Sequence, residues 1–368
     1  MKKIPIMDLQ LQYRSVKSDI QRMSKNIFER QAFILGPDVK QCEESISKYC
    51  SAEYGVGLNS GTDALILALD AMGIGAGDEV ITTPFTFIAT AEAICRVGAI
   101  PVFVDIDPVT YNIDPGLIAK SITKKTKAII PVHLYGLCAD MDPIMKVASK
   151  YGLKVIEDAA QAIGSLYKNR KAGSLAHAAA ISFYPGKNLG CFGDGGMIVT
   201  SDKKLSDKIR VLRDHGSSVR YYHEAVGYNS RLDNFQAAVL NIKLKHLDGW
   251  IEGRIKNAMF YNDSLKELPI AVPCIPSGYK HSFHQYTLRS SRKKEIEEYL
   301  IKNGIEVRTY YPVPLHLQKC FANLGYKAGA FPEAEKASAE VFSIPVYPEL
   351  TDRQKKYIAE KIRSFFTG

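Results

Sequence analysis

The sequence predicts an α/β protein with a mostly parallel sheet, followed by a smaller α+β unit. Three observations lead to this expectation. The chain has 368 residues, short β-branched runs alternate with longer helical patterns between residues 54 and 200, and the pattern changes after about residue 249. A chain of this length forms two domains, or one domain with an appendage. We therefore expect a large domain over residues 1–248, including an N-terminal helical arm, and a small C-terminal domain over residues 249–368.

The first elements are expected to be helical. One helical stretch precedes Gly36, and Pro37 is well placed to open the next helix because proline is tolerated at the first helical position. After these helices, apolar and β-branched runs predict buried strands separated by helices. The predicted strands lie near 54–58, 79–82, 101–104, 128–132, 154–157, 179–183 and 197–200, and the intervening helices begin near Gly61, Thr86, Asp140 and Lys203.

The C-terminal part has a different pattern. Helices dominate from Arg231 onward, and after residue 249 the order becomes helix, strand, helix, strand and two further helices. The two strands are expected near 285–288 and 306–309, with the helix between them running through Leu300. Helices and strands that are not regularly alternated are typical of an α+β unit.

Composition describes a soluble globular chain whose positive charge is uneven. Hydrophobic residues make up 46% and charged residues 24% of the chain, which excludes a disordered polymer. The net charge is +9, of which residues 1–184 carry +1 and residues 185–368 carry +8. Such an excess suits nucleic acid, a membrane surface or a small anionic ligand. No aromatic residues are interleaved with the basic clusters, so we interpret them as solvated faces and expect no nucleic-acid partner.

Cysteine usage and hydropathy indicate a cytoplasmic protein. The seven cysteines are odd in number and scattered, without a Cys-x-x-Cys pair, which argues against disulfides and zinc. Only His281 and His284 are close neighbours among the histidines, and we expect no metal site. Asp8 interrupts any signal-peptide core, and Asp63 and Asp70 interrupt the longest apolar run, so neither a signal peptide nor a membrane span is expected.

Three segments could bind a phosphate group. The glycine-rich run 73–77 ends a helix before a strand, which is the reverse of the order in a dinucleotide fold. The segment 186–188 lacks the Ser or Thr of a nucleotide-binding P-loop. The segment 59–64 follows a strand and opens a helix, so its backbone N–H groups could hold a phosphate. An ordinary helix cap explains this last segment equally well.

Two further residues favour the phosphate site. Asp158 lies just past the carboxyl end of a buried strand, where ligands bind in open α/β sheets, and Lys187 directly follows another strand. A phosphate cradle, a carboxylate and a lysine amine are the three groups that pyridoxal 5′-phosphate requires. Taken singly, a solvated surface lysine and a capping aspartate remain the simpler explanations.

Six motifs together resemble one enzyme family, the pyridoxal-phosphate-dependent nucleotide-sugar aminotransferases (DegT/DnrJ/StrS). The likeness runs from Asp8 to about Leu350. The resemblance implies a fold-type-I aminotransferase, with a large domain built on a mixed, mainly parallel sheet, a smaller C-terminal domain, and a homodimer with shared active sites. The motifs are Asn59-Ser60-Gly61-Thr62, Thr83-Pro84-Phe85-Thr86-Phe87, Val132-His133-Leu134-Tyr135-Gly136, Glu157-Asp158-Ala159-Ala160-Gln161, the Lys187 segment with Gly193-Asp194-Gly195-Gly196, and Tyr228-Asn229-Ser230-Arg231-Leu232-Asp233.

The resemblance assigns roles around the cofactor. Lys187 corresponds to the lysine that forms the Schiff base and moves the proton, and Asp158 to the partner of the pyridine N–H. Phe87 matches the aromatic that stacks on the ring, although a core position is the simpler explanation for a lone Phe. Gln161 matches a residue beside the ring oxygen. The phosphate ligands would be Gly61, Thr62 and Ser182, joined by Asn229 of the neighbouring subunit.

Substrate residues are also indicated. Tyr184 and His316 match positions that approach the sugar, although packing or a surface position explains either equally well. The arginines Arg220, Arg231 and Arg308 are candidates for diphosphate or carboxylate recognition, because a guanidinium matches those oxygens, and surface solvation is the simpler explanation for any one of them. The motifs are most similar to enzymes that aminate C-3 of a dTDP-3-keto-6-deoxyhexose, with glutamate as the expected donor. A UDP-linked 3-keto N-acetylglucuronate, a 4-keto sugar and a non-catalytic regulator are the alternatives. Lys187 argues against the family's dehydratases, which carry His there, and Leu137 departs from the family pattern.

Overall fold

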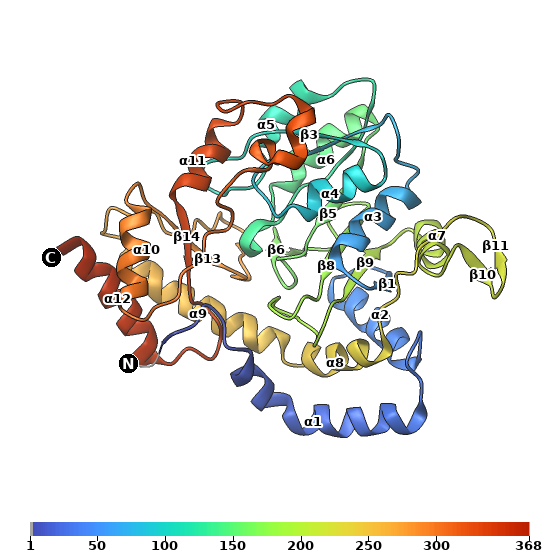
Figure 1. The fold of residues 1–368 in the computed structure, drawn as a ribbon, viewed down its shortest axis with the longest axis horizontal. Helices are drawn as coiled ribbons and strands as arrows, with labels where there is room; N and C mark the ends of the chain where they lie inside the picture. Colours follow the sequence, from blue (N-terminus) through green and yellow to red (C-terminus); the bar gives the residue numbers. More distant parts are fainter. Residues whose placement is uncertain (1–2, 368) are drawn as a thin grey trace.

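The computed structural model describes residues 3–367, so Met1, Lys2 and Gly368, at the ends of the two predicted domains, lie outside the described residues. The chain begins with α1 (Leu9–Arg30), which extends along the lower edge of the molecule in Figure 1, and continues with α2 (Pro37–Tyr49), which packs against the central sheet. The Asp8 side chain caps α1 by accepting from the N–H groups of Gln10 and Leu11. Pro37 opens α2, as its sequence predicts.

A seven-stranded sheet forms the centre of the large domain, in the order β1-β9-β8-β5-β4-β2-β3. Only β9 runs antiparallel to its neighbours, and every other pairing is parallel. The expected mixed, mainly parallel sheet is therefore confirmed. The strands are β1 (Tyr54–Leu58), β2 (Glu79–Thr82), β3 (Ile100–Phe103), β4 (Thr126–Ile129), β5 (Lys154–Asp158), β8 (Ala178–Ser182) and β9 (Gly196–Thr200).

Helices cover both faces of this sheet, because successive side chains of a strand point to opposite faces. Ala178 and Ala180 pack against one group of helices, and Ala179 and Ile181 against another (Figure 1). The first group is α3 (Gly61–Ala71), α4 (Ala89–Arg96) and α7 (Lys203–Arg213); the opposite face is covered by α2, α5 (Pro115–Ile118), α6 (Met141–Tyr151), α8 (Asn234–Leu244) and the start of α9 (Leu247–Leu265).

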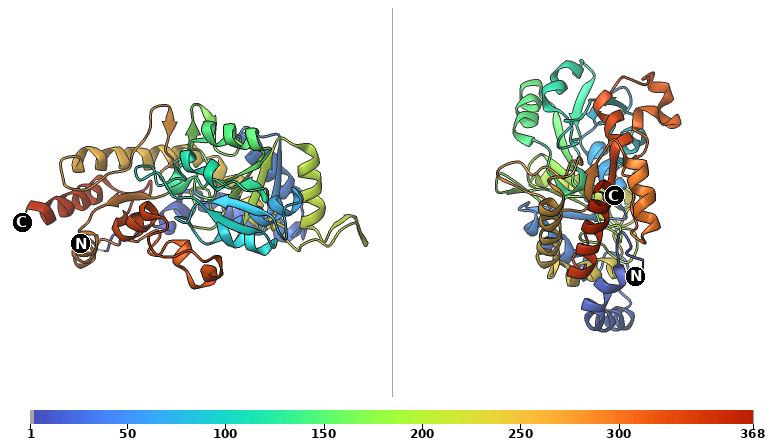
Figure 2. Two further views of the ribbon diagram at one scale, coloured as in Figure 1. Left: turned by 90° about the horizontal axis from the view of Figure 1, so that it is seen from above. Right: turned by 90° about the vertical axis from the view of Figure 1, so that its left-hand side faces the viewer.

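The C-terminal part has a second apolar core around a two-stranded antiparallel sheet, β13 (Tyr286–Arg289) with β14 (Val341–Ile344). Helix α9 links the two cores, since Leu247 and Ile251 belong to the first and Ala258 and Tyr261 to the second (Figure 2). The boundary between residues 248 and 249 stays a prediction. The other helices are α10 (Lys293–Lys302), α11 (Pro332–Glu340) and α12 (Asp352–Thr367), with 3₁₀ turns at Ala119–Ser121, Leu134–Gly136, Leu315–Leu317 and Lys319–Leu324.

Several predicted boundaries need correction. Helix α4 begins at Ala89 and not near Thr86. No strand forms at 306–309, where only isolated bridges join Ile305 to Ile4 and Arg308 to Ser343. β14 was not predicted because its four residues follow α11 without a turn signal. Five short strands were also missed, because strands of two or three residues carry no periodicity: β6 (Leu166–Tyr167) with β7 (Arg170–Lys171) and β12 (Tyr279–Lys280), and the hairpin β10 (Ser217–Val219) with β11 (Tyr222–His223).

Within residues 3–367, no helix is both long and apolar enough to cross a membrane.

Candidate active site

The candidate residues converge at the edge of the sheet where β1, β5 and β8 end and β9 begins. Leu58 and Ser182 both pair with Gly196, and Asp158 pairs with Ala180. The carboxyl ends of parallel strands share one edge, which is where ligands bind in open α/β sheets. Residues that are far apart in the sequence are thus brought together by strand pairing.

The phosphate-binding candidates form a tight contact between two chain segments at this edge. Gly61 opens α3, and a Cβ placed on it would lie 2.7 Å from the Cβ of Ser182. Ser60 caps the helix, because its hydroxyl accepts from the N–H of Asp63 at 3.0 Å. The first N–H groups of a helix have no intrahelical acceptor and attract anions. Gly61 and Ser182 therefore meet beside the free N–H groups at the start of α3, an arrangement that suits an anion.

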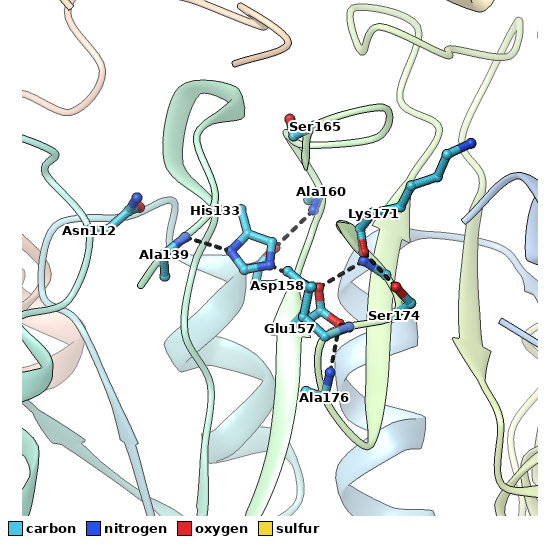
Figure 3. A network of polar contacts seen from close by, with 12 residues as sticks. Asn112, His133, Ala139, Glu157, Asp158, Ala160, Ser165, Lys171, Ser174 and Ala176 are labelled. Atoms are coloured by element: carbon cyan, nitrogen blue, oxygen red, sulfur yellow. Dashed lines mark hydrogen bonds and ion pairs between the residues drawn. The ribbon is translucent and has the colours of Figure 1, made fainter. Parts of the chain in front are cut away.

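Glu157 and Asp158 are neighbours at the end of β5 that serve opposite faces of the sheet. The Glu157 carboxylate is buried, lies 2.9 Å from His133 Nε2 and accepts from the N–H groups of Gly173, Leu175 and Ala176 (Figure 3). Four contacts satisfy this carboxylate, as a buried charge requires. Glu157 is thus a fastening point for the loop after β7 and not part of the open site.

The Asp158 carboxylate lies at the open edge and is held in one orientation. Its Oδ2 accepts from the Thr90 hydroxyl of α4 at 2.7 Å, and its Oδ1 accepts from the N–H of Ala160 at 3.2 Å. The Thr86 hydroxyl lies 3.1 Å from that of Thr90. The backbone is fixed as well, because Asp158 donates its N–H to Pro131 and accepts from the N–H of His133. A carboxylate held in this way can pair with a ring N–H without rearranging.

Lys187 lies in the turn that follows β8, where its N–H donates to the carbonyl of Tyr184 at 2.8 Å. Desolvation of the amine lowers the pKa of Lys187 to about 8, while the charge of Asp158 opposes this shift. An amine with such a pKa is neutral in about one molecule in ten at pH 7, and this neutral form is the one that nucleophilic attack and proton transfer require.

An aromatic and an amide complete the inner wall of the site. Phe87 is 54% exposed, so the alternative of a core position is wrong. Its ring lies 6.0 Å from the ring of Tyr311. Gln161 is buried, accepts from the N–H of Tyr135 at 2.7 Å, and donates to the Tyr311 hydroxyl at 3.1 Å. Tyr311, from the C-terminal part, thereby joins the side chains of the large domain.

The substrate candidates lie in three different environments. Tyr184 is exposed beside the Lys187 turn. His316 is buried, with Nε2 3.0 Å from Glu335 and its ring packed edge-on against Phe331, an arrangement that favours packing over sugar contact. Arg220 is exposed in the turn of the β10–β11 hairpin, which projects away from the body of the molecule (Figure 1). Tyr184 and Arg220 are thus accessible to a ligand, and the His316 side chain is not.

Asn229 follows the β10–β11 hairpin, and the two remaining arginine candidates form ion pairs. Asn229 is exposed and its backbone pairs with Asp214, while the adjacent Ser230 donates to Asn59. Arg231 forms an ion pair with Asp214 at 2.8 Å. Arg308 is paired with Glu306. Each arginine already has a carboxylate partner within its own subunit.

These residues fit pyridoxal phosphate. A glycine in close contact with Ser182 and a free helix N-terminus suit the phosphate, Asp158 suits a protonated pyridine, and the exposed Phe87 ring offers a stacking face. The lowered pKa of Lys187 suits attachment of a carbonyl group.

Sequence analysis missed two residues of the site. Thr90 contacts Asp158 across 68 positions of the chain, and Tyr311 contacts Gln161 across 150 positions. The sequence carries no signal for Thr90, because a threonine on a helix is ordinary. Tyr311 lies five residues before the candidate His316, and no motif marks it as a contact of Gln161; the role of His316 stays a prediction.

Comparisons with known proteins agree with this geometry. The model of the DegT/DnrJ/EryC1/StrS aminotransferase family matches residues 14–363. Among solved structures, the crystal structure of DesV from S. venezuelae in complex with a ketimine intermediate superposes with a TM-score of 0.97 at 41% identity, covering 99% of each chain.

Curated relatives span nearly the whole chain. A protein of Geobacillus stearothermophilus named pleiotropic regulatory protein is 52% identical, over 99% of this chain and 98% of its own length. UDP-N-acetyl-3-dehydro-α-D-glucosamine 3-aminotransferase of Acidithiobacillus ferrooxidans is 45% identical, over 99% and 98%. The dTDP-3-amino-3,4,6-trideoxy-α-D-glucose transaminase of Streptomyces venezuelae is 41% identical, over 99% and 96%. The chain belongs to the DegT/DnrJ/EryC1/StrS aminotransferase family and is a pyridoxal-phosphate-dependent transaminase.

Proposed function

We propose that the protein transfers an amino group from glutamate to the keto carbon of a nucleotide-linked hexose, with a 3-keto sugar such as a dTDP-3-keto-6-deoxyhexose as acceptor. The observation that carries this proposal is that two relatives, 45% and 41% identical over almost the entire chain, are both named for amination at C-3 of a nucleotide sugar. One relative is named for a UDP sugar and the other for a dTDP sugar, so these names constrain the position of amination more than the identity of the nucleotide.

When bound, pyridoxal phosphate would withdraw electrons from the carbon that gains or loses the amino group. Lys187 would attach the cofactor through its amine and, once displaced by the donor, move a proton at the substrate carbon. Asp158, oriented by Thr90, would hold the pyridine nitrogen protonated. Gly61, Thr62 and Ser182 would bind the phosphate, with Asn229 reaching it from a second subunit.

The remaining side chains would shape the cavity around the reacting carbon. Phe87 would stack on the ring, and Gln161 would lie beside the ring oxygen while fixing Tyr311. Tyr184 is proposed to contact the sugar from the same subunit and Arg220 the diphosphate from the partner subunit. His316 is proposed only as a secondary contact to the sugar, because its side chain is already buried against Glu335. The proposal also places the enzyme in the cytoplasm as a homodimer.

A regulatory role is the second candidate, because the 52% identical relative is named a pleiotropic regulatory protein. A sensor has no need of a proton-transferring lysine. The combination of an amine with a pKa of about 8 and an oriented carboxylate at Asp158 favours catalysis. The two functions separate experimentally, because only an enzyme turns over a keto-sugar.

The test is an incubation of the purified holoenzyme with glutamate and either dTDP- or UDP-linked 3-keto and 4-keto hexoses. Product masses and the position of the new amine are then read by mass spectrometry and NMR. The proposal expects amination at C-3. Amination at C-4 only would overturn the regiochemistry, and absence of any aminated product from the whole panel would favour the regulatory role.

A further inference from the structure

The turn that carries Lys187 is held by a buried lysine of α8. Lys243 is 2% exposed, and its Nζ donates to the carbonyl of Gly190 at 2.6 Å and lies 4.8 Å from the centre of the Phe192 ring. Within residues 3–367, no carboxylate forms an ion pair with it. Burying an ammonium without an ion-pair partner costs free energy, and desolvation lowers the pKa of Lys243 to about 8, while the charge of Glu349 opposes this shift. The carbonyl that Lys243 binds, that of Gly190, lies three residues after Lys187.

The Gly190 carbonyl is rigidly connected to the Lys187 turn. A Cβ on Gly190 would lie 2.5 Å from the carbonyl oxygen of Pro185, so the two ends of the turn are in direct contact. The N–H of Cys191 donates to Phe183 at 2.8 Å, which closes the loop at its base. Movement of Gly190 would therefore displace the turn that contains Lys187.

A second buried cation binds the segment 282–284, which contacts the Lys187 turn. Arg254 of α9 is 4% exposed and donates from Nη1 to the carbonyls of Phe283 and His284, at 3.2 and 3.4 Å. This segment is joined to the Lys187 turn by Asn188, whose amide donates to the carbonyl of Ser282 at 3.1 Å. Both segments around Lys187 are thus fastened to consecutive helices through charged donors.

We propose that Lys243 and Arg254 are positioning residues, which hold the backbone on both sides of Lys187 and thereby fix its amine relative to Asp158. Charged donors form stronger hydrogen bonds to carbonyl groups than neutral donors do. Helices α8 and α9 pack into the apolar cores of the protein, so backbone that is hydrogen-bonded to them is restrained from moving. This inference rests on the proposed role of Lys187 as the lysine that attaches the cofactor.

The test compares Lys243→Met with Lys355→Met. Lys355 is a matched control, because it is 4% exposed and lies over an aromatic ring, Phe260, at 5.6 Å, but its ammonium pairs with Asp352 on α12. For each apoprotein, the affinity for pyridoxal phosphate is measured by absorption titration. The fraction of Lys187 that borohydride traps on the cofactor is measured by mass spectrometry, and the melting temperature reports stability separately.

We expect Lys243→Met to weaken cofactor affinity about tenfold, the equivalent of losing one charge-assisted hydrogen bond, and to lower the trapped fraction. Lys355→Met should leave both unchanged, whatever its melting temperature. Lys243→Arg, which keeps a cationic donor, should retain most of the affinity, and Arg254→Lys should lower the trapped fraction in the same direction. If the Met variant does not fold, Lys243→Gln takes its place.

Equal cofactor affinity and trapping in the Lys243 and Lys355 variants would overturn the inference. Lys187→Ala separates this failure from failure of the proposed function. If cofactor is still trapped on the protein in Lys187→Ala, the role of Lys187 is wrong. If trapping is lost there but unaffected in Lys243→Met, only the positioning role is wrong.

Discussion

Two regions contribute to the proposed active site, the edge of the sheet and the β10–β11 hairpin, and they differ in how they are held. At the sheet edge, Asp158 is bonded at both carboxylate oxygens and at its backbone. In the hairpin, Tyr221 and Tyr222 are 78% and 73% exposed, and the element extends away from the body of the subunit (Figure 1). A single subunit therefore holds the proposed cofactor residues of the sheet edge in fixed positions, whereas Arg220 lies in an exposed turn of the hairpin.

The largest effect is expected from a substitution at the sheet edge. Lys187→Ala should lower the transamination rate by about 10²- to 10⁴-fold, the range that a positioned proton-transfer group contributes. The measurement is kcat for the glutamate half-reaction with cofactor added in excess. Lys168→Ala, which removes an exposed lysine remote from the turn, should have no such effect. A Lys187→Ala enzyme with full turnover would contradict the assignment.

The pH dependence of cofactor attachment is a second test of the sheet-edge residues. Desolvation lowers the pKa of Lys187 to about 8, so the neutral amine is lost as pH falls below that value. The rate of attachment to the apoenzyme should fall about tenfold per pH unit below 8 and level off above it. Asp158→Asn removes the charge that opposes the shift, so the inflection should move to lower pH. Stopped-flow absorbance measures the attachment rate in the two proteins. A rate that does not change between pH 6 and 8 would contradict the lowered pKa of Lys187.

A smaller effect is expected from the orientation of Asp158. Thr90→Val removes the hydroxyl donor but keeps the shape of the side chain, and should weaken cofactor binding about tenfold, as expected for one hydrogen bond to a charged group. Thr200→Val is the matched control, because that buried hydroxyl donates only to the carbonyl of His177. Equal cofactor affinity in the two variants would show that Asp158 does not depend on Thr90.

The hairpin, together with Asn229 six residues beyond its end, is tested by mixing subunits. Asn229→Ala and Arg220→Ala should each reduce activity by a few-fold to about tenfold, since each removes one contact to an anionic group. If these residues act across a dimer, mixing Arg220→Ala with Lys187→Ala subunits should restore activity, because one site of each mixed dimer then holds both intact residues. Activity that stays at the sum of the two separate variants would show that Arg220 does not complete a partner site.

The smallest effect concerns the uneven charge. Residues 185–368 carry +8 of the net +9, and an anionic nucleotide sugar should be attracted to this half. Raising ionic strength from low to about 0.5 M should increase KM for the sugar nucleotide a few-fold, because salt screens surface charge. A KM that does not change with salt would leave the excess charge with no part in substrate binding.

The sequence by itself determined the class of the fold and most of the strand positions. Apolar runs bounded by turn residues mark β1, β8 and β9, because a strand buried on both faces is predominantly apolar along its length. Strand-end positions also identified Asp158 and Lys187, since the edge of a parallel sheet follows from strand direction alone. The roles given to these residues stay predictions, as does the boundary at residue 249.

Only the tertiary structure decided which residues support them. Thr90 and Tyr311 contact Asp158 and Gln161 across long stretches of chain, and β14 forms because β13 offers it a partner. Local sequence cannot encode such contacts, because their free energy depends on two segments meeting. The same reason explains Lys243: on the sequence it is an ordinary lysine at the end of a helix, and only packing against Gly190 turns it into a buried support for Lys187.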